Sequence, residues 1–93
     1  MAEIVIKIQG HQYIPQSQAL KGRDTVVWKN MTGQVQTATS DAPTDQPLFF
    51  DTGDIAPGET SQPWAVPDVA WPEIDYHSKH DPEMRGTLSF SLK

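Results

Sequence analysis

The side chains best suited to chemistry lie in one short segment near the C-terminal end of the chain. His77 and His80 are three positions apart, Asp81 follows directly, and Met84 comes three residues later. Imidazole, carboxylate and thioether groups are all metal ligands. A turn at His80-Asp81-Pro82 would let both imidazoles hold Cu(II) or Zn(II) at the surface; the other interpretation is two solvated histidines. The spacing alone leaves both interpretations open.

The same segment does not predict catalysis. Ser78, His80 and Asp81 are the residue types of a hydrolytic triad, but a triad needs Ser–His and His–Asp contacts beside an oxyanion site. Residues this close together on one loop rarely meet those requirements, and no nucleophile motif surrounds Ser78. The chain has no cysteine, which excludes thiol catalysis, disulfides, iron–sulfur clusters and zinc fingers. We therefore expect a protein that is not an enzyme.

Composition limits the architecture and the partners. A chain of 93 residues, 37% of them hydrophobic, has room for a single domain (1–93) with one core. The net charge of −5 disfavours nucleic acid and anionic membrane surfaces, both of which require a basic patch. No apolar run is long enough to cross a bilayer. We expect a soluble, acidic domain that binds no nucleic acid, does not insert into membranes and is free to bind a protein.

Short alternating segments must position the chemical residues. Apolar residues recur with period two in segments 3–8, 24–30, 74–78 and 86–93, and each predicts a strand. A further strand is expected at 35–39, and an edge strand, interrupted by Pro63, at 59–66. Polar segments with prolines predict loops at 40–47 and at 67–72, and Asp81-Pro82 is expected to close the strand before it.

Alternation also predicts which way the side chains point. In the strand at 74–78, Ile74, Tyr76 and Ser78 share the inner face, and His77 lies on the opposite face. Trp71, flanked by Ala70 and Pro72, has two interpretations: an exposed residue that anchors an interface, or a cap over one end of the sandwich. No stretch shows helical spacing of apolar residues over three turns. Seven or eight short strands with Gly and Pro turns predict an all-β fold, an antiparallel Greek-key β-sandwich.

Six segments, in order along nearly the whole chain, resemble the cupredoxin family of small blue copper proteins, in particular its amicyanin/plastocyanin-like group. The segments are Tyr13-x-Pro15 followed by D-T-V-V-W-K-N at 24–30, T-A-T-S-D at 37–41, F-D-T-G at 50–53, I-A-P-G-E-T at 55–60, D-Y-H at 75–77 and P-E-M-R-G-T at 82–87. The resemblance implies a cupredoxin-like sandwich and, by analogy, a family role in electron transfer.

The four positions at which the family holds copper are occupied differently here. The resemblance places a His, a Cys, a His and a Met at positions that in this chain are Gln36, Ser78, Asp81 and Met84. A type 1 site needs two imidazoles and a thiolate in a plane with a weak axial Met. An amide, a protonated hydroxyl and a carboxylate suit harder cations. The resemblance therefore implies a degenerate copper site, with no type 1 copper and at most weakly bound copper or zinc.

The first functional hypothesis is a non-enzymatic module that binds a protein or, weakly, a type 2 metal. A partner would dock at the Gln36/Asp81/Met84 end, because family members use that end to dock redox partners. Within the former site, Gln36, Ser78 and Asp81 are expected to converge near Met84 and to hydrogen-bond to one another. A new hard-metal or small-ligand site at the same place is the other interpretation.

The second hypothesis is a copper-binding or electron-transfer protein with a rebuilt site of His77, His80, Asp81 and Met84. A one-residue slip of the strand would bring His77 and His80 to the Cys and His positions of the family. The slip is disfavoured because it would turn Ile74 off the inner face together with the rest of the strand.

The N-terminus bears on the compartment. Met1-Ala2-Glu3 leads directly into a strand pattern, and no signal peptide is recognisable. We expect a cytoplasmic protein if the chain is complete, and the resemblance implies a periplasmic one if a leader has been removed.

Overall fold

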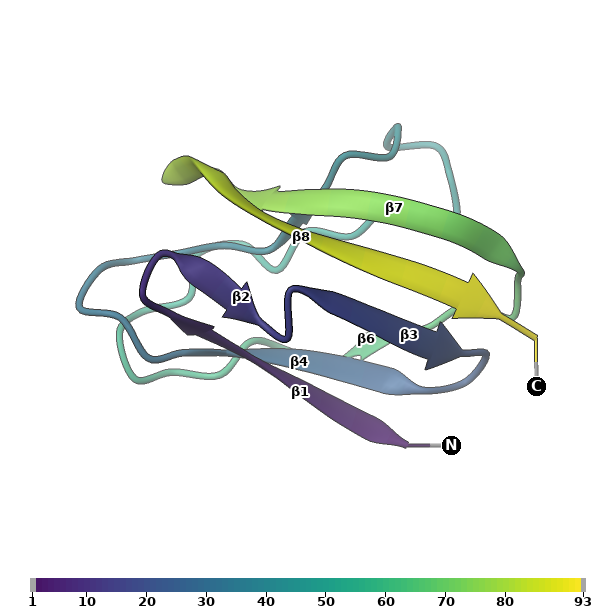
Figure 1. Cartoon of the computed structure of the whole chain (residues 1–93), viewed down its shortest axis with the longest axis horizontal. Coiled ribbons are helices and arrows are strands. Elements are labelled where there is room, and N and C mark those ends of the chain that lie inside the picture. Colours follow the sequence, from purple (N-terminus) through teal and green to yellow (C-terminus); the bar gives the residue numbers. More distant parts are fainter. Residues whose placement is uncertain (1, 93) are drawn as a thin grey trace.

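The computed structural model describes residues 2–92, which form eight strands in two facing sheets (Figure 1). The predicted β-sandwich is therefore confirmed. Within residues 2–92, no helix is long and apolar enough to cross a membrane. The first sheet has the order β2 (Gln12–Ile14), β1 (Glu3–Gln9), β4 (Thr25–Asn30) and β6 (Trp64–Ala65). The second has the order β3 (Ser17–Lys21), β8 (Asp81–Ser91), β7 (Trp71–Ser78) and β5 (Thr39–Ser40).

Both sheets are mixed, whereas the sequence predicted antiparallel pairing throughout. β1 runs parallel to β4, and β3 runs parallel to β8, while the remaining pairs are antiparallel. The chain passes from one sheet to the other between β2 and β3 (Figure 1). As a result, each sheet contains one pair of neighbouring strands that run in the same direction. A period-two pattern records which face is buried and not the direction of the neighbouring strand, which is why it missed this.

The strand predicted at 35–39 is reduced to β5 and two isolated bridges, Gln36 with Ile55 and Thr39 with Asp51. Only Thr39 and Ser40 pair with β7, and Gln36 exchanges backbone hydrogen bonds with Ile55. The buried Asn30 side chain donates to the carbonyls of Gln34 (2.7 Å) and Ile55 (2.8 Å). The Asn30 side chain thus satisfies the Gln34 carbonyl and adds a second hydrogen bond to the Ile55 carbonyl, in a segment that forms little regular strand pairing.

The boundaries of β7 and β8 also differ from the prediction. Trp71 lies at the start of β7, paired with Phe90, and not in a loop. β8 begins at Asp81 and not at Gly86, because Ser78 pairs with Asp81 across a two-residue turn. The predicted break at Asp81-Pro82 is therefore wrong, since a proline is compatible with the start of a strand. The result is a long hairpin whose tip carries Lys79 and His80.

An aromatic cluster fills the space between the sheets and fixes the hairpin. Trp28 is fully buried, and its ring lies 5.2 Å from that of Phe50 and 5.6 Å from that of Tyr76. The Tyr13 ring lies 4.4 Å from the Tyr76 ring, and its hydroxyl donates to the Thr37 carbonyl at 2.6 Å. Burial raises the pKa of both tyrosines well above its ordinary value. The cluster holds β7 and the segment after Gln36 against each other.

Asp24 anchors the turn between β3 and β4. Its carboxylate accepts hydrogen bonds from the backbone N–H groups of Lys21 and Ala2, both at 3.0 Å. The bond from Lys21 is the main reason why the pKa of Asp24 lies below its ordinary value; burial opposes that shift, and the bond from Ala2 adds to it. The ionised form is therefore the one that the fold favours.

Replacing Asp24 by Asn is expected to lower the free energy of unfolding at neutral pH by about 1–3 kcal/mol. The amide oxygen is a weaker acceptor than a carboxylate oxygen, and the amide NH₂ group would face one of the two backbone N–H groups. A carboxylate whose pKa is lowered by folding stabilises the folded protein fully at pH values above its unfolded-state pKa of about 3.9. It loses that contribution as the pH falls through its folded-state pKa. In urea unfolding, the difference between wild type and Asp24→Asn should be constant near neutrality and shrink below about pH 4. A difference independent of pH would contradict this role.

Candidate functional site

A buried polar pair occupies the place where the sequence predicted the site. Gln36, held by its backbone bridge to Ile55, and Ser78, the last residue of β7, are 1% and 0% exposed. The Ser78 hydroxyl donates to Oε1 of Gln36 at 2.8 Å. These two side chains, 42 residues apart in the chain, therefore meet as expected.

The Ser78 hydroxyl uses its full bonding capacity. Besides donating to Gln36, it accepts from the backbone N–H of Thr37 (3.1 Å) and, at longer range, from that of His80 (3.3 Å). A hydroxyl has one proton and two lone pairs, so no bonding position is left over. His80 reaches Ser78 only through its backbone N–H, because its imidazole ring contacts Asp54. The contact between a Ser hydroxyl and a His ring that a triad requires is therefore not made.

Met84 completes the buried part of the set. It lies on the inward face of β8, is 2% exposed and belongs to the hydrophobic core. The thioether is therefore packed among apolar side chains rather than presented at the surface. Of the four positions at which the resemblance places copper ligands, Gln36, Ser78 and Met84 are buried at one end of the sandwich.

Asp81 does not join this group. We expected it to converge on Gln36 and Ser78, but its carboxylate lies 3.0 Å from Nδ1 of His11 in the turn after β1. Because Asp81 is the first residue after the two-residue turn, its side chain points outward across the end of the sandwich, where it remains partly exposed. The predicted mutual bonding is thus confirmed for Gln36 and Ser78 and wrong for Asp81.

The two histidines of the predicted metal segment lie apart, each with its own carboxylate. Nδ1 of His77 lies 2.6 Å from Asp41, and Nε2 of His80 lies 2.8 Å from Asp54. His77 is on the face opposite Ser78, so the register expected without slip is confirmed. In the part of the chain that the structure describes, no three His, Cys, Asp or Glu side chains are grouped so that they could hold a metal ion.

The hairpin tip is tied to the neighbouring loops by one Lys–Asp ion pair and two His–Asp contacts. Lys79 Nζ lies 2.6 Å from Asp51, His80 contacts Asp54, and Asp81 contacts His11. Burial opposes the ionisation of Asp51, but hydrogen bonds from Lys79, the Gly53 N–H and Thr39 outweigh it and lower the pKa of that carboxyl. Sequence reasoning missed the roles of Asp51 and Asp54, whose only signal was their place in the turn-forming D-T-G-D segment at 51–54.

A type 1 copper ion does not fit these residues. It requires a thiolate and two imidazoles, whereas the two buried side chains that meet here are an amide and a hydroxyl bonded to each other. Both are neutral, hard oxygen donors, and coordination by Gln36 Oε1 would break the hydrogen bond that satisfies it.

Ser78→Ala is expected to lower the free energy of unfolding by about 2–4 kcal/mol, because it leaves the Thr37 N–H and the Gln36 Oε1 buried without their partner. The exposed Ser17 provides the matched control, and Ser17→Ala should change stability by less than about 0.5 kcal/mol. Chemical denaturation of both variants measures the difference. Equal, small losses would contradict the structural role of the Ser78 hydroxyl.

Comparison with known proteins identifies the fold by its similarity to solved structures. No protein-family profile and no curated protein sequence matches the chain. Solved structures of amicyanin do: the copper(I) form of one amicyanin mutant matches with a TM-score of 0.79 and 22% identity over 95% of this chain and 81% of that one. The copper(I) form of another matches with a TM-score of 0.80 and 20% identity over 96% and 82%. The chain therefore has the cupredoxin fold.

Proposed function

We propose that this chain, a β-sandwich with the cupredoxin fold, works without type 1 copper as a non-enzymatic protein-binding module. The observation that carries the proposal is the buried hydrogen bond from the Ser78 hydroxyl to the Gln36 amide. The resemblance places a copper-bound Cys and His at these two positions, and here each side chain satisfies the other. A pocket filled in this way is stable without an ion, because its polar atoms already have partners.

The protein-binding surface in this proposal is the end of the sandwich above the buried pair. Gln36 and Met84 are themselves too buried to contact a partner. The loop after β4 instead exposes Met31 (44%) and Val35 (37%). Beside them is a groove of about 360 Å³ lined by Gly10, His11, Thr32, Gly33, Gln34 and Gln36. Exposed apolar side chains next to a groove are typical of protein contact sites.

The copper-free part of the proposal is tested by calorimetric titration of the wild type, His80→Ala and Met84→Leu with Cu(II) and Zn(II). We expect only weak binding, because the surface imidazoles are paired singly with carboxylates, and we expect Met84→Leu to leave it unchanged. Stoichiometric binding with a Kd below about 1 μM that is lost in Met84→Leu would overturn the proposal.

The docking part needs a separate experiment. Peptides selected on the wild-type protein from a random library should bind Met31→Asp and Val35→Asp at least about tenfold more weakly, because a charge at the centre of an apolar contact is costly. Val5 on β1 is equally exposed (46%), and Val5→Asp serves as the matched control that should retain binding. Peptides that are insensitive to the first two variants would place the contact surface elsewhere.

A further inference from the structure

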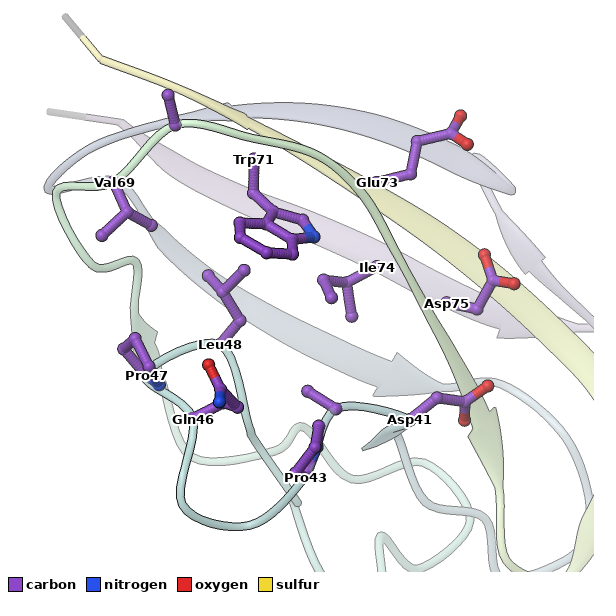
Figure 2. A pocket seen from close by; sticks show the side chains of 12 residues that line it. Asp41, Pro43, Gln46, Pro47, Leu48, Val69, Trp71, Glu73, Ile74 and Asp75 are labelled. Atoms are coloured by element: carbon purple, nitrogen blue, oxygen red, sulfur yellow. The ribbon is translucent and has the colours of Figure 1, made fainter.

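A second hollow lies away from the Gln36 end. It is a groove of about 800 Å³ between the loop 41–48 and the first residues of β7, at the opposite end of that strand from Ser78 (Figure 2). Neither the copper-free interpretation nor the proposed docking end uses it. Its size is within the range of sites that hold a small organic molecule, about 300–1,000 Å³.

The floor and one wall of this groove are apolar and held in place. Figure 2 shows the Trp71 indole projecting from β7 into the groove, with Leu48 and Ile74 directed toward the same space. Leu48 belongs to the buried core and Ile74 packs against it, while Trp71 is paired with Phe90 of β8 and still 50% exposed. An aromatic face held on a strand and left open to solvent is a preorganised surface for an apolar body.

The charge around the groove has one sign. Its twelve lining residues include Asp41, Glu73 and Asp75, and none of them is Lys, Arg or His. Asp41 is paired with the guanidinium of Arg85 and also contacts His77. Asp75 accepts a hydrogen bond only from the uncharged hydroxyl of Thr87, and Glu73 forms no ion pair in the described part of the chain. Two carboxylates at one side of the groove thus keep their negative charge uncompensated.

We propose that this groove binds a small organic cation, an ammonium group carried on an apolar body of about the size of an aromatic ring. The body would pack against Trp71, Leu48 and Ile74. The ammonium would lie at the rim on the β7 side, in the field of Glu73 and Asp75 and without direct contact, because Figure 2 shows both carboxylates directed away from the Trp71 indole. Aromatic faces and carboxylates both attract cations, and the net charge of −5 adds a favourable long-range field. The same field repels an anion of identical shape.

The proposal is tested with 2-phenylethylammonium chloride, titrated at low salt into the ¹⁵N-labelled full chain and followed by NMR. We expect saturable shifts confined to the Trp71 indole N–H and the backbone amides of Leu48, Ile74 and their neighbours, with a Kd of about 1 mM. The uncharged 2-phenylethanol should bind about three- to tenfold more weakly, and 3-phenylpropionate more weakly still. Shifts that do not saturate by about 20 mM, or equal binding of the anion, would overturn the proposal.

Two variants separate the apolar from the charged contribution. Trp71→Ala should weaken all three probes about tenfold or more, and Trp71→Phe should retain much of the affinity, which shows that the loss is local. The double variant Glu73→Gln/Asp75→Asn should remove the advantage of the cation over the alcohol while leaving the alcohol unchanged. Glu83→Gln, at an exposed carboxylate of β8 that does not line the groove, is the control and should change nothing. A cation preference that survives the double variant would refute the role of the rim.

Discussion

Gly86→Ala is expected to destabilise the protein by about 3 kcal/mol or more, which for a chain of this size lowers the melting temperature by roughly 12–24 °C. A Cβ atom at position 86 would lie 2.5 Å from Cζ and 2.6 Å from the hydroxyl of Tyr76. The Tyr76 ring faces Gly86 across the β7–β8 pair and is also packed against Tyr13, Trp28 and Phe50. A fully buried ring enclosed on these sides has no free space into which it can move.

The matched control for this prediction is Gly33→Ala, because an added Cβ there meets no atom within 4 Å. Its effect should be below about 1 kcal/mol. A double-mutant cycle with Tyr76→Leu tests the cause, since Gly86→Ala should cost much less once the aromatic ring is gone. Thermal and urea unfolding supply the four stabilities. If Gly86→Ala cost as much in the Tyr76→Leu variant as in the wild type, the backbone of Gly86, and not the clash, would be responsible.

The triple variant Gln36→His/Ser78→Cys/Asp81→His is expected to bind Cu(II) with an intense visible charge-transfer band that the wild type cannot produce. The hydrogen bond between Gln36 and Ser78 shows that side chains at two of these positions meet in the interior. Met84 is already buried on the neighbouring strand β8, and its thioether is the group that such a site uses as a weak axial ligand. The third imidazole must turn inward from the direction that Asp81 now takes toward His11.

Two controls isolate the origin of the band. The double variant Gln36→His/Asp81→His, which keeps the Ser78 hydroxyl, should bind copper without the intense absorption, because the band needs a thiolate. The double variant Gln36→His/Ser78→Cys tests whether an inward-facing group at position 81 is required. Absorption and EPR spectra with one equivalent of Cu(II) give the readout. A triple variant that is folded and colourless would show that these positions do not map onto a copper site.

The alternation of side chains along the strands predicted which residues face the interior of the sandwich and which face away from it. It assigned Tyr76 and Ser78 to the interior and His77 to the opposite face, and the structure confirms that assignment. The resemblance added that Gln36 would meet Ser78, a contact that no local pattern contains. It could not reveal how that contact is completed, since the Ser78 hydroxyl also accepts from the N–H groups of Thr37 and His80, whose positions depend on the irregular segment after Asn30 and on the hairpin turn.

The contacts at the hairpin tip were beyond the reach of the sequence for a physical reason. The partners of Asp81, His77 and His80 lie 70, 36 and 26 residues away in three different turns. Strand periodicity fixes which face a residue occupies but not the direction of a side chain that leaves a tight turn. The groove at Trp71 was equally hidden: the sequence left open whether the indole is exposed or caps the sandwich, and Leu48 and Ile74 come to face it only once the sheet has formed.

The most direct test of the central claim, that the Gln36–Ser78 pair closes the former copper pocket, is paramagnetic broadening of the wild-type ¹H–¹⁵N spectrum by Cu(II). Copper that binds only at surface imidazoles should first broaden the amide signals around His11 and His80. The signals of the Gln36 side-chain amide and those nearest Met84 should broaden later, and they should broaden less the farther they lie from those rings. Loss of the Gln36 and Met84 signals at substoichiometric copper, ahead of those of His11, would show that the ion enters the pocket and would contradict the account.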